Sequence, residues 1–133
     1  MSEMKRLPDT EYDVMRVIWS NPSPITTTVM MEKLGKERGW AVPALITMLN
    51  RLHEKGFLYS EKKGKMRYYY PLIKKHDYLE FVTNEFIEKY HGGSFTSLFA
   101  TLFDVRMVSD ETLDTFVAWV KKHRQEFRRY LPD

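Results

Sequence analysis

The feature that most constrains the fold is a change of hydrophobic period at Gly56. Before it, apolar residues recur at the spacing that gives a helix one buried face, at Leu45, Met48, Leu49 and Leu52. After it, residues 57–61 and 66–70 alternate as half-buried strands do, and residues 62–65 form a turn between them. The middle of the chain therefore predicts a helix that ends at Gly56 and runs directly into a β-hairpin.

Two further helices are predicted before this unit. The first ends at residues 21–24, Asn-Pro-Ser-Pro, because proline cannot continue a helix. Thr26 or Thr27 can cap the second, and the third begins near Pro43, since proline is favoured in a first helical turn. Three helices followed by a hairpin are typical of a winged helix-turn-helix, so we predict such a DNA-binding domain in residues 1–73.

The rest of the chain, residues 74–133, is predicted to be helical, which makes the whole fold mainly α with a small β-hairpin. Its helices carry large apolar and aromatic side chains on wide faces. A wide apolar face without a partner in its own chain usually packs against a second copy. The alternative is that these helices fold back on the first domain as a monomer. We predict a homodimer formed by Tyr78, Val82, Phe86, Tyr90, Phe95, Leu98, Phe99, Leu102, Phe103, Leu113, Phe116, Val117 and Val120.

Positive charge is concentrated in one part of the chain, although the net charge is only +3. Residues 51–75 carry eight basic and two acidic side chains, whereas residues 76–133 carry seven basic and ten acidic ones. This asymmetry indicates that one surface faces a polyanion; a solvated lysine-rich loop is the alternative. Flexible cations around a glycine turn suit phosphate contacts, so we predict that the wing binds DNA through Lys62, Lys63, Lys65 and Arg67.

The third helix is predicted to lie in the major groove of double-stranded DNA. The residues expected on its DNA side are Pro43, Ala44, Ile46, Thr47, Asn50 and Arg51. Thr47 can offer a hydroxyl or contact a thymine methyl group, and Ala44 can also meet such a methyl. Asn50 and Arg51 could contact bases or phosphates. Their alternative roles are hydrogen bonding on the helix surface and an ion pair with a nearby carboxylate.

An enzyme is not indicated, and neither is a cofactor or a metal site. The chain has no cysteine, which excludes disulfides, thiolate catalysis and thiolate metal ligands. The four histidines are scattered, and no phosphate-binding loop or nucleophile motif occurs. No apolar run approaches the length of a membrane span, and the first residues show no signal-peptide pattern. We therefore expect a cytoplasmic protein.

Several short motifs follow one another in a recognisable order: Glu11-Tyr12-Asp13-Val14-Met15-Arg16-Val17-Ile18-Trp19, Pro24-Ile25-Thr26, Trp40, Asn50-Arg51-Leu52, Lys55-Gly56 and Tyr69-Tyr70-Pro71-Leu72. In this order they resemble the penicillinase-repressor family, which contains the BlaI and MecI repressors of β-lactam resistance and copper-responsive repressors. The similarity covers about residues 7–123. It implies a homodimeric repressor with an N-terminal winged helix and a C-terminal dimerisation region, bound to a palindromic operator.

Two differences from the family pattern bear on function. Family members commonly have Ser-Pro-Lys-Thr after the tryptophan and another cation two residues later, whereas this chain has Ala41–Ala44 and Ile46 there. Inducible members are cut by a sensor protease system at an Asn-Phe bond, and the matching pair here is Thr101-Leu102. The absence of cysteine excludes the copper branch's mode of sensing. Cleavage of the same specificity is therefore not expected, and the inducer or sensor protease that the resemblance implies as a partner is not specified by the residues.

These observations predict a sequence-specific DNA-binding transcriptional regulator, with repression inherited from the resemblance. One alternative is a protein–protein interaction module that docks through the apolar edge from Val42 to Ile46. Another is a ligand-sensing regulator whose aromatic C-terminal helices enclose a small molecule. The regulated genes and the operator are not specified by the residues.

Overall fold

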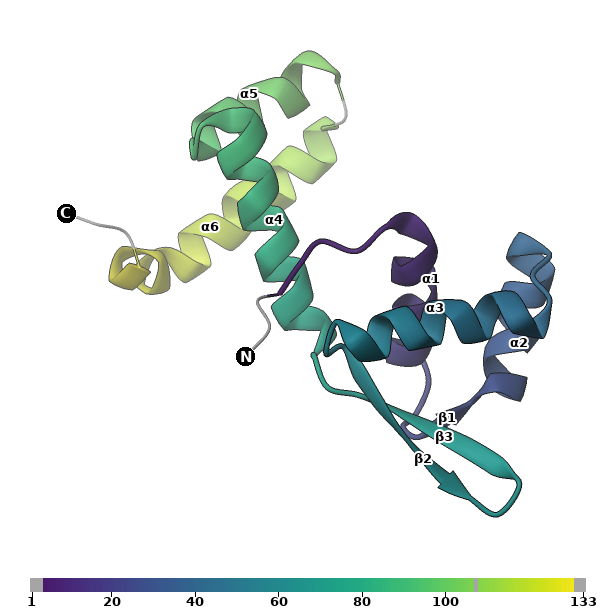
Figure 1. Ribbon diagram of the computed structural model, residues 1–133. Coiled ribbons are helices and arrows are strands. Elements are labelled where there is room, and N and C mark those ends of the chain that lie inside the picture. Colours follow the sequence, from purple (N-terminus) through teal and green to yellow (C-terminus); the bar gives the residue numbers. More distant parts are fainter. Residues whose placement is uncertain (1–3, 107, 131–133) are drawn as a thin grey trace. The chain divides into compact units, whose positions relative to one another are not determined.

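The computed structural model describes residues 4–106 and 108–130, with side chains as far as residue 126 (Figure 1). The chain forms two compact units, and the boundary falls between Glu85 and Phe86, inside helix α4 (Lys75–His91). The boundary predicted from the sequence, after residue 73, lies earlier. The difference arises because the first turns of α4 belong to the core of the first unit, as described below.

Besides the first turns of α4, the first unit contains three complete helices and three short strands. They are α1 (Asp9–Trp19), β1 (Ile25–Thr26), α2 (Thr27–Arg38), α3 (Val42–Glu54), β2 (Leu58–Lys63) and β3 (Met66–Pro71). The strands form one antiparallel sheet in the order β1-β3-β2, in which Ile25 lies opposite Tyr69 and Ser60 also lies opposite Tyr69 from the other side. The predicted winged helix-turn-helix is thus confirmed as a fold, with β1 as a strand that the sequence did not predict.

Local signals explain where α2 and α3 begin and end. Thr26 rather than Thr27 caps α2, because its side-chain oxygen accepts the backbone N–H of Val29. Gly39 ends α2 in the left-handed conformation, with a φ of 67° that most residues avoid. Proline occupies the first turn of α3, as predicted, and Gly56 follows its end with a φ of 81°.

The core of the first unit is built on the predicted apolar face of α3. Leu45, Leu49 and Leu52 are fully buried, and Met48 packs partly against the same core. Tyr78 from the first turn of α4 is also only 2% exposed there. Tyr78 was predicted to be part of a dimer interface, whereas the structure buries its side chain within its own unit and leaves almost none of its surface for a second copy. Val82 likewise packs against this core and is partly buried.

The second unit contains the end of α4, α5 (Phe95–Asp104) and α6 (Asp110–Tyr130). Ser94 caps α5 by accepting the N–H of Ser97, and Ser109 accepts the N–H of Thr112 at the start of α6. None of the residues of α5 is buried, although the helix is strongly apolar. No helix among the described residues is both long enough and apolar enough to cross a bilayer.

Candidate nucleic-acid interface

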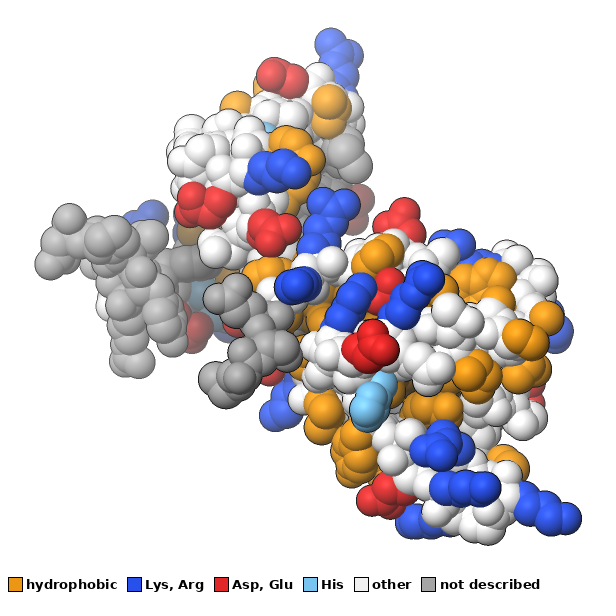
Figure 2. Space-filling view, in the orientation of Figure 1, with side chains coloured by type: hydrophobic (Ala, Val, Ile, Leu, Met, Phe, Trp, Pro, Cys, Tyr) orange, Lys and Arg blue, Asp and Glu red, His pale blue; other side chains and the backbone are white. Residues whose placement is uncertain are grey.

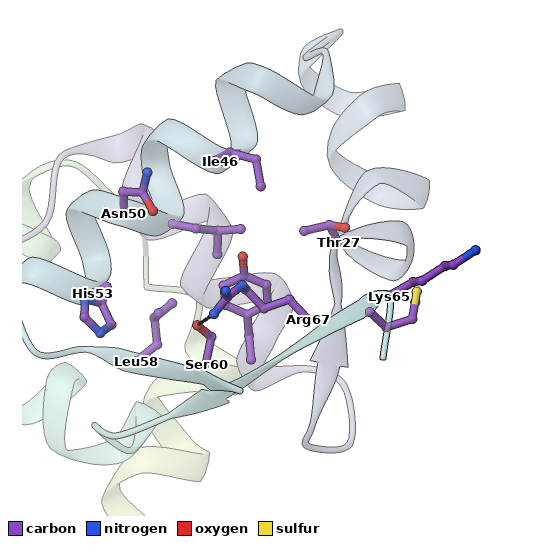
Figure 3. Close-up of a pocket in the computed structure, with 11 residues that line it drawn as sticks. Thr27, Ile46, Asn50, His53, Leu58, Ser60, Lys65 and Arg67 are labelled. Carbon is purple, nitrogen blue, oxygen red and sulfur yellow. Dashed lines mark hydrogen bonds between the residues drawn. The ribbon is translucent and has the colours of Figure 1, made fainter. Parts of the chain in front are cut away.

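An open groove of about 580 Å³ separates α3 from the β-hairpin (Figure 3). It brings together four residues predicted to contact DNA: Ile46 and Asn50 from α3, and Lys65 and Arg67 from the hairpin. The sequence analysis did not identify the other lining residues, which are Thr27, Leu49, His53, Leu58, Ser60, Met66 and Tyr69. Two of these polar residues, His53 and Ser60, could have been found from their spacing in the sequence. His53 follows Asn50 by one helical turn, and Ser60 alternates in step with the buried Leu58.

A hydrogen bond across the hairpin holds Arg67 at this groove. Its guanidinium Nη1 donates to the Ser60 hydroxyl at 2.9 Å, and both side chains lie between the hairpin and α3 (Figure 3). The two residues share one face of the hairpin, since Ser60 pairs with Tyr69 and Lys62 pairs with Arg67. Lys62 and Arg67 are therefore two cations directly opposite each other. Their repulsion is a local cost that a bound polyanion would remove.

The hairpin tip presents further cations to solvent. Lys62, Lys63 and Lys65 are exposed, and Figure 2 shows basic side chains gathered over this end of the first unit. Lys63 lies 6.0 Å from the centre of the Tyr68 ring and only 3.9 Å from Glu61, whose carboxylate is itself half-exposed. Among the described residues, Lys62 and Lys65 form no ion pair. These ammonium groups remain available to phosphates.

Gly64 allows the tip to turn tightly. Its φ is 64°, and no atom lies within 4 Å of the position that a Cβ would occupy. The glycine is therefore required by its backbone conformation and not by a close neighbour. This leaves open space in front of the tip for a DNA backbone to approach.

The outer face of α3 carries the remaining predicted contacts. Pro43, Ala44, Thr47 and Arg51 are exposed but do not line the groove. The Thr47 hydroxyl donates to the backbone carbonyl of Pro43, four residues earlier, at 3.0 Å. Arg51 forms no ion pair among the described side chains, so the alternative role as a surface ion pair finds no partner there.

Tyr69 lines the groove with a buried, uncharged side chain. Burial raises its pKa, and the nearby positive charge of Arg67 opposes that shift only in part. The phenol therefore stays neutral at physiological pH. Lys65 and Arg67 supply permanent positive charge to the groove. No group of three or more potential metal-binding side chains occurs among the described residues.

Comparison with known proteins gives the family. The model of the family described as penicillinase repressor matches residues 7–122. The chain belongs to the penicillinase repressor family. It is 29% identical over 124 residues to the penicillinase repressor of Bacillus licheniformis, covering 93% of this chain and 96% of that protein. It is 27% identical over 104 residues to the methicillin resistance regulatory protein MecI of Mammaliicoccus sciuri, and the match covers 78% of this chain and 84% of that protein.

A solved structure supports the winged-helix assignment within this family. The DNA-binding domain of the repressor BlaI, determined in solution, is 37% identical to this chain with a TM-score of 0.52. The aligned region covers 59% of this chain and 94% of the BlaI domain. The family match, in contrast, extends from residue 7 into α6 and so includes both units.

The second unit of this penicillinase repressor family member exposes most of the residues predicted for dimerisation. Phe103 is 65% exposed, and the side chains of Phe86, Tyr90, Phe95, Phe116 and Val117 are also exposed. The remaining ones, which are partly buried, are Leu98, Phe99, Leu102, Leu113 and Val120. Phe99 stacks on Phe116 at 5.9 Å between ring centres, so α5 and α6 share a small aromatic contact. Such exposure of aromatics is unusual for a monomeric surface.

Proposed function

We propose that this chain is a sequence-specific DNA-binding transcriptional repressor that binds a palindromic operator as a homodimer. The observation that carries the proposal is the groove between α3 and the wing, bordered by Lys65 and Arg67, with Lys62 opposite Arg67 on the same hairpin face. The relatives support it: they are named repressors or resistance regulators, and the matching BlaI domain is described as DNA-binding.

In this proposal α3 enters the major groove and the hairpin follows the adjacent backbone. Asn50 and Arg51 supply hydrogen-bond donors on the exposed side of α3, and amide or guanidinium groups can contact purine edges. Lys62, Lys63 and Lys65 neutralise phosphates, which supplies affinity that weakens with salt. Base contacts then determine the sequence, and phosphate contacts determine the position of the protein on the duplex.

The exposed apolar surface of the second unit supports the proposed homodimer. A helical region with exposed Phe95, Phe103 and Phe116 would be expected to associate rather than remain in water. Twofold symmetry places two copies of α3 on two half-sites, which is why a palindromic operator is expected.

Analytical ultracentrifugation of the full chain should give the mass of a dimer at micromolar concentration. Phe103→Asp should shift it toward monomer, while Thr101→Asp at a neighbouring exposed position should not.

The DNA-binding proposal is tested by fluorescence-anisotropy titration. The labelled duplex should come from immediately upstream of the protein's own gene, with a scrambled duplex of equal length as control and two salt concentrations. Selective binding that weakens with salt is expected. Equal affinity for both duplexes would contradict the proposed function.

A second candidate function is ligand sensing by the second unit. An apolar cavity of about 240 Å³ lies between α5 and α6, lined by residues that include Phe95, Phe99 and Phe116. Small apolar molecules occupy cavities of this kind. A ligand-dependent rise in the unfolding temperature, together with loss of operator binding, would favour this candidate as the release mechanism.

A further inference from the structure

The DNA-facing side of α3 begins with an uncharged edge. Its first residues, Val42, Pro43 and Ala44, are all exposed, and Val42 is 49% exposed despite being fully apolar. Ala41 precedes the helix without any side-chain cap. Ile46 continues this edge one turn later and faces the groove (Figure 3). The first charged side chain of the helix is Arg51.

The one hydroxyl on this edge is already engaged. The hydroxyl proton of Thr47 is donated to the backbone carbonyl of Pro43 at 3.0 Å. A base acceptor would have to break that bond to receive the proton. Without such a cost Thr47 offers DNA its γ-methyl and the acceptor lone pairs of its oxygen, but no donor. The side chains of the first two turns of α3 therefore present methyl and methylene groups and no free side-chain donor.

The major groove has one matching apolar feature. Thymine carries a C5-methyl group there, whereas the other standard bases present only hydrogen-bonding groups or a ring C–H. Val42 and Ile46 are four residues apart and share one face of the helix, so both can approach neighbouring bases of one strand. An apolar edge inserted beside other bases would bury their polar groups without compensation.

We infer that the apolar edge of α3, formed by Val42, Ile46 and Thr47, selects operator sequence by packing against thymine methyl groups. This rests on the proposed DNA-binding function and assigns the chemistry of recognition to particular residues. Polar recognition then falls to Asn50 and Arg51, and affinity for the phosphates to the wing. The occupant is DNA because the cations Lys65 and Arg67 border the same groove as Ile46.

The test uses uracil, which lacks only the C5-methyl and keeps every hydrogen-bonding group of thymine. Operator sequences are first selected with the full-length protein from a random duplex pool, and selected sites should be rich in thymine within each half-site. Replacing those thymines by deoxyuridine should weaken binding about fourfold for each methyl buried against the helix. Deoxyuridine at thymines outside the half-sites serves as the control and should leave affinity unchanged.

Two variants assign the effect to the edge. Ile46→Ala removes apolar contact surface and should reduce the ratio of thymine to uracil affinities toward one. Because Ile46 also packs partly on the core, Val42→Ala at an exposed position provides a second variant that keeps the core intact. Lys62→Ala is the matched control, because it should weaken binding to both duplexes equally and leave the ratio unchanged.

The outcomes separate this inference from the function on which it rests. Selective, salt-dependent binding that ignores the replacement of thymine would overturn the inference and leave the repressor proposal intact. Absence of any selective binding would overturn both, and the apolar edge would then be a surface for a protein partner. A thymine preference that persists in both Val42→Ala and Ile46→Ala would also overturn the assignment to this edge.

Discussion

The phenolic oxygen of Tyr78 accepts a hydrogen bond from the backbone N–H of Leu7 at 2.8 Å, joining positions 71 residues apart. The ring packs among three other aromatics, with centre-to-centre distances of 6.0 Å to Tyr12, 5.7 Å to Trp19 and 5.6 Å to Phe57. The Trp19 indole in turn donates to the carbonyl of Ile73 at 2.9 Å. The start of α4 is thus a structural part of the winged-helix unit.

Tyr78→Phe is expected to lower the free energy of unfolding by about 1–3 kcal/mol. The substitution keeps the aromatic packing and removes only the oxygen, so the buried N–H of Leu7 loses its acceptor. Urea denaturation followed by circular dichroism measures the change. Tyr59→Phe is the control, because Tyr59 is exposed on the hairpin and the same chemical change there should have no effect. Equal stabilities of Tyr78→Phe and the parent chain would show that the bond contributes nothing.

The same buried tyrosines predict loss of stability in alkaline solution. Burial raises the pKa of Tyr78 and of Tyr69 above the value of about 10 that a tyrosine has in the unfolded chain. A pKa raised by folding contributes stability that is complete below about pH 10 and is lost as the pH rises through the folded-state pKa. The free energy of unfolding should therefore fall above about pH 10, and less steeply in Tyr78→Phe. An unchanged slope in that variant would contradict the assignment to Tyr78.

Much of the fold could be predicted because its signals are local. The stripe of leucines on α3, the change of period at Gly56 and the proline in the first turn of α3 each act within a few residues. The strand β1 was missed because two residues, Ile25 and Thr26, have no measurable period. The place of Tyr78 was missed for a different reason. Helical spacing shows that a side chain lies on the apolar face of its helix. It does not show whether that face packs in the core of the first unit or in a dimer interface.

In the candidate site, too, some residues could be predicted from the sequence and others could not. The cations of the hairpin could be predicted from composition, since a cluster of lysines around Gly64 is visible in the sequence. The positions of Ser60 and His53 in the groove depend on strand register and on the approach of the hairpin to α3. Periodicity places His53 on the Asn50 side of α3 and Ser60 on the Leu58 face of the hairpin, but it does not bring these two faces together. The hydrogen bond from the Thr47 hydroxyl to the Pro43 carbonyl likewise depends on a side-chain rotamer that the sequence does not determine.

A third stability prediction concerns the ion pair between Glu11 of α1 and Lys55, just beyond α3. Glu11 is 2% exposed, whereas the Lys55 side chain is 31% exposed. Lys55→Met should cost on the order of 2 kcal/mol, because it leaves a buried carboxylate without its cation. The partial exposure of Lys55 keeps this below the cost for a fully buried pair. Urea denaturation measures the change, with Lys36→Met on the exposed surface of α2 as control.

The double variant Glu11→Met with Lys55→Met tests the cause. Replacing both charges by apolar side chains of similar size should recover most of the lost stability, since no buried charge then remains unpaired. If the double variant is as unstable as the sum of the two single ones, the ion pair is not the source of the effect.

The last prediction concerns the hydrogen bond that positions Arg67. Ser60→Ala removes the hydroxyl that accepts from the guanidinium, so Arg67 is released to sample orientations away from the groove. We expect operator affinity to fall about two- to fivefold, equivalent to the roughly 0.5–1 kcal/mol contributed by one such bond. Anisotropy titration measures the change, and circular dichroism should be unaltered because Ser60 is only partly buried.

Ser60→Thr is the matched control, since it keeps a hydroxyl at the same position on a strand that tolerates β-branched residues. It should retain the parent affinity. In Arg67→Ala the further change Ser60→Ala should have no additional effect, because the hydroxyl then has no guanidinium to hold. If Ser60→Ala weakens binding equally with or without Arg67, the serine acts directly on the DNA and not by positioning the arginine.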